Sequence, residues 1–341
     1  MRGPEVTAIV VNHNGAGFVE EAVASLLAQR DVTLEVVVVD NASQDGSDVA
    51  LERRFGDAIR LLRAGANLGF GGGNNLGIRG SQTPWVVLLN SDAVAEPGLV
   101  AELVRVAAAD ARIGMVAPKV LSHERPELID TVGHLLAPDG LNRGRGRGEI
   151  DAGRYDACET ALFPSGAAAL YRRAMLDEIG LFDEVLFLYG DDADLGLRGR
   201  LAAWGCALAP RAVARHHYSR STGAYSTLKA FHVERNRILL LLKLFPLRFI
   251  LLSPFHTASR MLLQAWGALR GEGAAGRMAA EQSVWSLVAV TLRAWRGAVA
   301  LAPRALRERR RLRGLRRLTT DEFAALLRDY PLTAREAALK D

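Results

Sequence analysis

The first half of the chain alternates short apolar runs with segments of helical periodicity. A β-branched run, VTAIVVN, ends at Asn12, and the apolar residues of 18–29 then recur at spacings of three and four. A second run, LEVVVVD, is apolar on both faces and ends at Asp40, which is typical of a parallel strand covered by helices. These residues predict a strand, a helix and a second strand.

The alternation continues to about residue 92. Residues 59–64 predict a third strand, residues 71–80 a helix, and the run WVVLLNSD a fourth strand. The pattern predicts an α/β domain with a mostly parallel central sheet flanked by helices. In such sheets ligands bind beyond the carboxyl ends of the strands, so one crevice can collect the polar residues found there. These residues are Asn12, Asp40, Asn67 and Asp92.

The middle of the chain is less regular. Residues 121–164 predict loops and short strands over one edge of the sheet, and FPSGAAALYRRAMLDEIG predicts a small-residue turn that leads into a helix. In GDDADLGLR, the carboxylates of Asp191, Asp192 and Asp194 open a further helix. Either Asp191 or Asp194 is expected only to cap that helix. Repulsion among the three raises the proton affinity of at least one, which suits a general base.

The glycine segment NLGFGGGNNLG allows two interpretations. Its backbone amides can approach a ligand closely. It also resembles a dinucleotide-binding turn, with Asp92 about 20 residues further on, so an NAD(P)-dependent oxidoreductase is an alternative. That alternative places the turn at the third strand instead of the first and leaves the acidic clusters without a role.

Two further groups suggest a metal and its phosphate ligand. Asp92 emerges at the end of a strand, and Mg²⁺ and Mn²⁺ are commonly held by one or two carboxylates plus phosphate oxygens. A neutral imidazole from His216 or His217 can complete the shell, and Arg220 can meet phosphate. Asp40 has two interpretations: it accepts hydrogen bonds from a base or ribose, or it only starts an Asx-turn.

Composition narrows the class of protein. The 341 residues are 49% hydrophobic and 24% charged, which predicts one large globular domain or a catalytic domain with an appendage. Two cysteines are too few and too distant for a disulfide framework or a cysteine zinc site, so a reducing compartment is expected. The first residues lack the layout of a signal peptide, which predicts a cytoplasmic protein.

The last hundred residues differ in character. An apolar run over 235–255 is interrupted by charged residues and a proline, and its pieces are shorter than the ~20 residues that span a bilayer. It predicts either a helix lying in the membrane interface or a buried helical hairpin, and Trp285 and Trp295 in a second apolar stretch favour the interface. Residues 303–317 carry eight arginines and one glutamate, which indicates an anionic partner, nucleic acid or membrane, or else a solvated helix face.

Seven motifs, taken in order, resemble the inverting family 2 glycosyltransferases with the GT-A fold, and most closely their bacterial rhamnosyltransferase-like members. The resemblance covers about residues 5–240. It implies a nucleotide-diphosphate-sugar donor, with dTDP-L-rhamnose as the first choice, a divalent metal (Mg²⁺ or Mn²⁺) and transfer with inversion. The motifs are VTAIVVNHN, VVVVDNASQDGS, NLGFGGGNNLG, LLNSDA, PSGAAALYRR, FLYGDDADLGLR and HHYSRST.

The resemblance also implies roles for the donor and metal residues. Asp40 matches the acid that contacts the nucleoside, and Asn12 lines the same pocket. Asp92 matches the last acid of the DxD motif, whose first acid is replaced by Asn90, so one charged ligand is absent. His216 matches a histidine that joins the metal in some members, and spacing does not decide between it and His217. The segment around the donor is matched by Asn67, Gly71 and Asn74.

For catalysis, Asp192 matches the base of the family's ED pair, and Asp191 stands where Glu is usual. The implied acceptor is a saccharide or lipid-linked saccharide, in cell-wall, O-antigen or exopolysaccharide assembly. We therefore expect a GT-A catalytic domain over 1–236 and a helical, apolar and basic extension over 237–341. We expect the extension to meet the cytoplasmic membrane surface and not nucleic acid. A non-catalytic, degenerate transferase is a second alternative, since it would account for the missing DxD acid.

Overall fold

A computed structural model describes residues 3–217, 226–271, 276 and 283–340. The chain divides into two compact units. The first unit comprises Met1–His134 and Gly144–Ser221, and the second comprises Leu135–Arg143 and Thr222–Asp341. The domain boundary after residue 236 stays a prediction, and it falls inside helix α7 (Thr227–Leu244).

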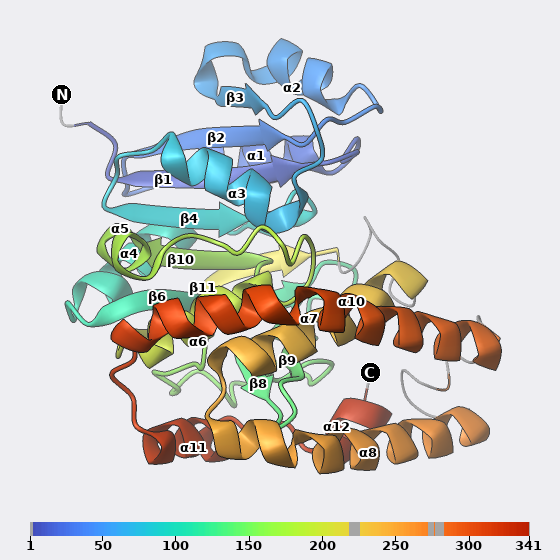
Figure 1. Cartoon of the computed structure of the whole chain (residues 1–341). Helices are drawn as coiled ribbons and strands as arrows, with labels where there is room; N and C mark the ends of the chain where they lie inside the picture. Colours follow the sequence, from blue (N-terminus) through green and yellow to red (C-terminus); the bar gives the residue numbers. More distant parts are fainter. Residues whose placement is uncertain (1–2, 218–225, 272–275, 277–282, 341) are drawn as a thin grey trace. The chain divides into compact units, whose positions relative to one another are not determined.

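The strands of the first unit that the structure describes build one nine-stranded sheet, in the order β3-β2-β1-β4-β10-β6-β11-β5, with β7 paired to β6 (Figure 1). Strands β1 to β4 run parallel, as do β6 and β11, whereas β10 is antiparallel to both of its neighbours. The prediction of a mostly parallel sheet flanked by helices is confirmed. The strands are β1 (Val6–Asn12), β2 (Leu34–Asp40), β3 (Arg60–Arg63), β4 (Trp85–Leu89), β5 (Ala93–Ala95), β6 (Ile113–Ser122), β7 (Ile129–Thr131), β10 (Ala168–Arg172) and β11 (Gly205–His216).

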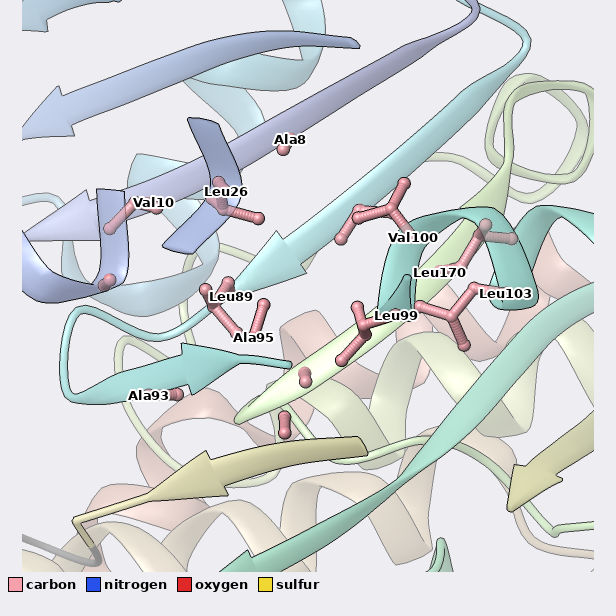
Figure 2. Close-up of a cluster of buried hydrophobic side chains, with 14 of the residues drawn as sticks. Ala8, Val10, Leu26, Leu89, Ala93, Ala95, Leu99, Val100, Leu103 and Leu170 are labelled. Carbon is pink, nitrogen blue, oxygen red and sulfur yellow. The ribbon is translucent and has the colours of Figure 1, made fainter. Parts of the chain in front are cut away.

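The core of this unit forms where helices α1 (Val19–Leu27) and α4 (Leu99–Ala108) meet the sheet. Figure 2 shows Leu26 of α1 in the same buried cluster as Leu103 of α4 and Leu170 of β10, which lie near each other, and all three side chains are fully buried. Burying each such side chain contributes roughly 1.5–3 kcal/mol. The helical spacing of apolar residues in α1 and the two-sided apolar runs of β1 and β2 thus specify the same core.

Strand β10 corrects one prediction. Residues 163–180 are not simply a turn that leads into a helix, because β10 precedes α5 (Arg173–Ile179). Its alanines and leucine favour a helix when taken alone. The strand forms because it pairs with β4 on one side and β6 on the other, and these long-range ladders outweigh the local preference.

The second unit is helical. Its helices are α7, α8 (Leu247–Arg270), α10 (Val284–Arg311), α11 (Thr320–Asp329) and α12 (Ala334–Leu339). Helix α7 packs against α10 and buries Leu240 and Leu244. Pro246 separates α7 from α8 and has no amide hydrogen with which to continue α7. In the described part of the chain, no helix combines the length and apolar content that crossing a bilayer requires.

A buried ion pair secures the helix that begins with the acidic cluster, α6 (Asp191–Leu201). Arg198 Nε lies 2.8 Å from Asp194 Oδ2, and both side chains are almost completely buried. The same guanidinium donates to the carbonyl oxygens of Ile179 and Gly180 at the end of α5. Asp194 therefore has a structural role in joining the two helices.

We expect Arg198→Met to lower the free energy of unfolding by about 3–5 kcal/mol, because it removes the cation beside a buried carboxylate. Urea denaturation measures the change. Arg211→Met is the matched control, because Arg211 is exposed and pairs with Glu102 at the surface, where such pairs contribute about 0–1 kcal/mol. Equal losses in the two variants would contradict the structural role of Arg198.

Candidate active site

The first two strands end together in a buried polar cluster. Asn12 lies in register with Asp40, and its Nδ2 donates to Asp40 Oδ1 at 3.0 Å and to Ser47 Oγ at 2.8 Å. Asp40 Oδ2 also accepts the amide of Ser43, which is the Asx-turn contact. Asn12 Oδ1 is buried and has no hydrogen-bond partner among the residues described. Asn12 and Asp40 thus form a buried polar cluster at the carboxyl ends of β1 and β2.

The glycine segment packs against the loop before the acidic helix. Helix α3 (Gly69–Arg79) begins at Gly69, whose φ is +72° and where a Cβ would collide with the carbonyl oxygen of Phe187. A Cβ at Gly71 would lie 3.0 Å from Asp191 Oδ1. The glycines at the start of α3 therefore allow close approach to the chain that carries Asp191.

The two asparagines predicted around the donor have local partners. Asn67 Oδ1 accepts the amide of Gly69 at 2.9 Å and so supports the first turn of α3. Asn74 is buried, and its Nδ2 donates to the carbonyl oxygen of Phe70 in the same helix. The structure thus brings Gly71 to the acidic cluster, while these amide groups stabilise α3 itself.

A tight turn after β4 presents Asp92 to the end of β11. The carbonyl oxygen of Asn90 accepts the amide of Ala93, and that of Asp92 accepts the amide of His217 at 2.9 Å. His216 Nε2 consequently lies 3.3 Å from Asp92 Oδ1. In contrast, His217 Nδ1 lies 3.0 Å from a carboxylate oxygen of Glu124. The structure therefore brings His216, and not the ring of His217, to Asp92.

A third strand completes the surroundings of His216. Asp130 of β7 places its Oδ2 2.8 Å from His216 Nδ1, and Arg147 Nη2 lies 3.0 Å from Asp130 Oδ1. Burial opposes protonation, but hydrogen bonds to Asp130 and Asp92 raise the pKa of His216 to about 10. For Asp92, burial is outweighed by the hydrogen bond and charge of His216, so its pKa is lowered. His216 is thus a cation between two buried carboxylates, and a metal that binds Nε2 would replace the proton there.

The carboxylate of Asp192 is held by backbone amides. Gly166 donates its amide to Asp192 Oδ2 at 3.1 Å, and the amide of Ala193 donates to Oδ1 at 2.8 Å. His134 Nε2 lies 3.8 Å from Oδ2, and the His134 ring stacks on Phe163. Burial lowers the pKa of His134, although the charge of Asp192 opposes this shift. His134 is therefore a neutral group beside Asp192.

The three acids of the cluster have different environments. Asp191 is buried, and burial together with the charge of Asp192 raises its pKa well above the usual value. Asp194 is bound to Arg198. The side chain of Asp192 is 18% exposed and can meet a substrate.

Sequence reasoning missed Asp130, His134 and Arg147. Asp130 and His134 are four residues apart, in β7 and β8 (His134–Leu136), and they connect the surroundings of His216 to Asp192. The segment IDTVGH falls in the stretch interpreted as loops and short strands. An aspartate and a histidine so close together in an irregular segment were the available signal.

The Asp92–His216 pair suits a divalent metal. The two side chains are only 11% and 10% exposed, and they present a carboxylate oxygen and an imidazole nitrogen to each other. A metal-binding histidine commonly donates its other ring N–H to a carboxylate, which is the position Asp130 occupies. Arg220, predicted to meet phosphate, lies outside the described residues.

The curled, mostly parallel sheet with its acids at the strand ends defines a glycosyltransferase of the GT-A class. The sequence profile described as glycosyltransferase like family 2 matches residues 4–237. The chain belongs to that family, and the predicted family, fold and enzyme class are confirmed.

Two relatives illustrate the range of the family. The chain is 29% identical over 236 residues to N-acetylglucosaminyl-diphospho-decaprenol L-rhamnosyltransferase of Mycobacterium tuberculosis. The matched region covers 63% of this chain and 76% of the relative. It is 35% identical over 113 residues to succinoglycan biosynthesis protein ExoO of Rhizobium meliloti, which covers 33% of this chain and 32% of that protein.

A solved structure agrees with the fold. The mannosyltransferase PcManGT from Pyrobaculum calidifontis, in complex with GDP-Man and Mn²⁺, superposes with a TM-score of 0.55 at 20% identity, over 92% of this chain and 86% of that one. At this identity the comparison supports the fold alone.

If Asp130 orients His216 toward a metal, Asp130→Asn should weaken Mn²⁺ binding by about 10–100-fold. Isothermal titration calorimetry measures the affinity. Asp151→Asn is the control, because Asp151 belongs to the same unit but binds Lys119 instead. An unchanged affinity in Asp130→Asn would remove Asp130 from the metal site.

Proposed function

We propose that the chain transfers a sugar from a nucleotide-diphosphate donor to a lipid-linked saccharide with inversion, in cell-wall, O-antigen or exopolysaccharide assembly. The first choice of donor is dTDP-L-rhamnose. The observation that carries the proposal is the connection of two chemical groups, Asp92–His216 and Asp192, through Asp130 and His134. The mycobacterial relative, an L-rhamnosyltransferase named for a diphospho-decaprenol acceptor, supports both the rhamnose and the lipid-linked acceptor.

In this proposal the donor binds along the carboxyl ends of β1 to β4. Asp40 and Asn12 are assigned to the nucleoside end of the donor, because their hydrogen-bonded polar groups lie at the carboxyl ends of the first two strands. Because Gly71 has no side chain, the first turn of α3 packs closely against Asp191, and in this proposal the donor lies beside that contact. Asn67 and Asn74 stabilise this helix and shape the pocket indirectly.

Asp92 and His216 would hold the divalent metal. Bound there, the metal supplies positive charge that stabilises the departing nucleotide diphosphate. Asp130 fixes the Nδ1–H of His216 and provides the second carboxylate of the region, since Asn90 replaces the first acid of the DxD motif. Arg147 offsets part of that negative charge.

Asp192 acts as the base. It takes the proton of the acceptor hydroxyl as the acceptor oxygen bonds to the anomeric carbon, and the bond from that carbon to the phosphate oxygen breaks on the opposite side. The amides of Gly166 and Ala193 hold the carboxylate in place. Burial and the charge of Asp192 raise the pKa of Asp191, which favours its neutral form next to the base.

The two alternatives are weighed against the same geometry. The glycine segment packs against Phe187 and Asp191 and follows the third strand, which favours the transferase over an NAD(P)-dependent oxidoreductase. A non-catalytic transferase would retain the pocket but would need no oriented base. Asp192 is both partly exposed and held by two amides, which supports catalysis.

A panel of nucleotide-sugars, tested for metal-dependent hydrolysis or transfer, identifies the donor. With that donor, we expect Asp192→Asn to lower kcat by at least about 10²–10⁴-fold, which is the range for losing general-base catalysis. Donor binding, measured as thermal stabilisation of the protein, should persist. An unimpaired turnover rate would show that Asp192 is not the base, and no turnover of any donor by the native chain would favour the non-catalytic alternative.

Asp191→Asn is the matched control for Asp192→Asn, because it makes the same chemical change at the preceding residue. The raised pKa of the buried Asp191 favours its neutral form, so an isosteric amide changes less charge there. We expect its effect on kcat to be much smaller than that of Asp192→Asn.

We further propose that the second unit holds the enzyme on the anionic inner face of the membrane. Helix α8 leaves a row of apolar side chains exposed at spacings of three, four or seven, which places them on one face. Arg307, Arg310 and Arg313 are also exposed and suit anionic headgroups. Most leucines of α7 are buried, whereas α10 exposes a second apolar row that includes Trp285, Leu292 and Val299. The α8 row consists of Leu247, Leu251, Phe255, Leu262, Trp266 and Leu269.

Flotation with vesicles that contain phosphatidylglycerol tests this docking. The triple substitution Leu251→Ser, Phe255→Ser and Leu262→Ser should abolish co-flotation of the full chain, because it removes the apolar centre of the α8 row. The control replaces Val49 and Ile150 with serine, since both are exposed on the first unit. Equal flotation of the two variants would count against docking through α8.

A further inference from the structure

We propose a second cation site in the first unit, formed by Glu21, His123 and His217 and suited to Zn²⁺. Glu21 belongs to α1, His123 follows β6, and His217 follows β11. One ligand atom from each of the three lies within 4.8 Å of the others. Three elements distant in sequence therefore bring two imidazoles and a carboxylate together.

Both imidazoles have a ring nitrogen that lacks a partner. His123 Nδ1 and His217 Nε2 are buried and make no hydrogen bond within the described ranges. A buried polar atom left unsatisfied costs about 1–3 kcal/mol. A cation would satisfy both nitrogens at once, because each neutral ring offers a lone pair there.

The partner of His217 fixes which nitrogen is available. His217 Nδ1 lies 3.0 Å from Glu124 Oε1, so a hydrogen on Nδ1 leaves Nε2 as the lone-pair donor. A carboxylate behind a metal-binding histidine is a common second-shell arrangement. Glu124 thus stands to His217 as Asp130 stands to His216, and the two adjacent histidines serve different sites.

The donor set indicates the kind of cation. Two imidazoles and one carboxylate suit Zn²⁺, with a fourth position open to solvent, whereas Mg²⁺ prefers oxygen ligands alone. Glu21 is exposed, which gives an ion access. The rings of His123 and His217 are stacked with centroids 3.6 Å apart. Zinc bonds of about 2.0–2.1 Å place two ligand nitrogens roughly 3.3 Å apart, so His123 turns out of the stack on binding.

Occupancy of this site would support the neighbouring one. The amide of His217 donates to the carbonyl oxygen of Asp92, so fixing His217 also fixes the turn that carries Asp92. The ion would clamp α1 to the ends of β6 and β11. The role is therefore structural, and it does not depend on the proposed transfer reaction.

Zinc binding to the tag-free full chain, measured by competition with a chromogenic chelator, tests the proposal. The double variant Asp92→Ala/His216→Ala should retain one equivalent of Zn²⁺, since it removes only the other candidate site. His123→Gln in the native background should lose one equivalent, and Glu124→Gln should weaken the same site by about 10–100-fold. His256→Gln is the control, because His256 is exposed on α8.

Circular dichroism and the urea midpoint check that each variant is folded. A rise of the native chain's Tm with one equivalent of Zn²⁺, absent in His123→Gln, would support the site independently of the double variant. If His123→Gln and His217→Gln bind as much zinc as the native chain, the cluster is not a cation site. Absence of zinc binding by the folded native chain would likewise overturn the proposal and assign the buried nitrogens to water.

Discussion

The position of His216 between Asp92 and Asp130 is the contact on which the catalytic region depends. It joins the end of β11 to the turn after β4 and to β7, three segments far apart in the sequence. Burying two carboxylates costs several kcal/mol each unless a cation and hydrogen bonds compensate them. His216 compensates both, and Arg147 adds a second contact to Asp130. Loss of the imidazole would therefore disturb the packing of these strand ends in addition to removing a candidate metal ligand.

In the proposed site, this contact also offsets the incomplete DxD motif. Asn90 takes the place of the first acid, and its carbonyl oxygen instead forms the turn that presents Asp92. The second carboxylate comes from Asp130, about 40 residues away in sequence. Asp130 contacts the imidazole of His216 and not the carboxylate of Asp92, so its charge acts on His216. A motif that lacks one acid in the sequence is thus supplemented by tertiary contacts.

The parts of the fold predictable from sequence are those that local pattern determines. Strands β1 and β2, helix α1 and the acid at the end of β2 all follow from apolar spacing and its interruption. Strand β10 could not be recognised, because its residues favour a helix and only pairing with β4 and β6 makes it a strand. Asp130 and His134 escaped for a related reason: their short strands become significant only where β7 reaches the end of β6. The choice between His216 and His217 likewise required the carboxylates that each ring meets.

The acidic cluster shows how environment gives identical residues different chemistry. Asp194 meets Arg198 one helical turn later and joins two helices. Asp191 is buried against the glycine segment, so burial and its neighbour's charge raise its pKa. Asp192 is left partly exposed, with its oxygens fixed by two amides and a neutral histidine beside it. The ion pair of Asp194 and the raised pKa of Asp191 both reduce repulsion within the cluster, and Asp192 presents the carboxylate that is exposed to a substrate.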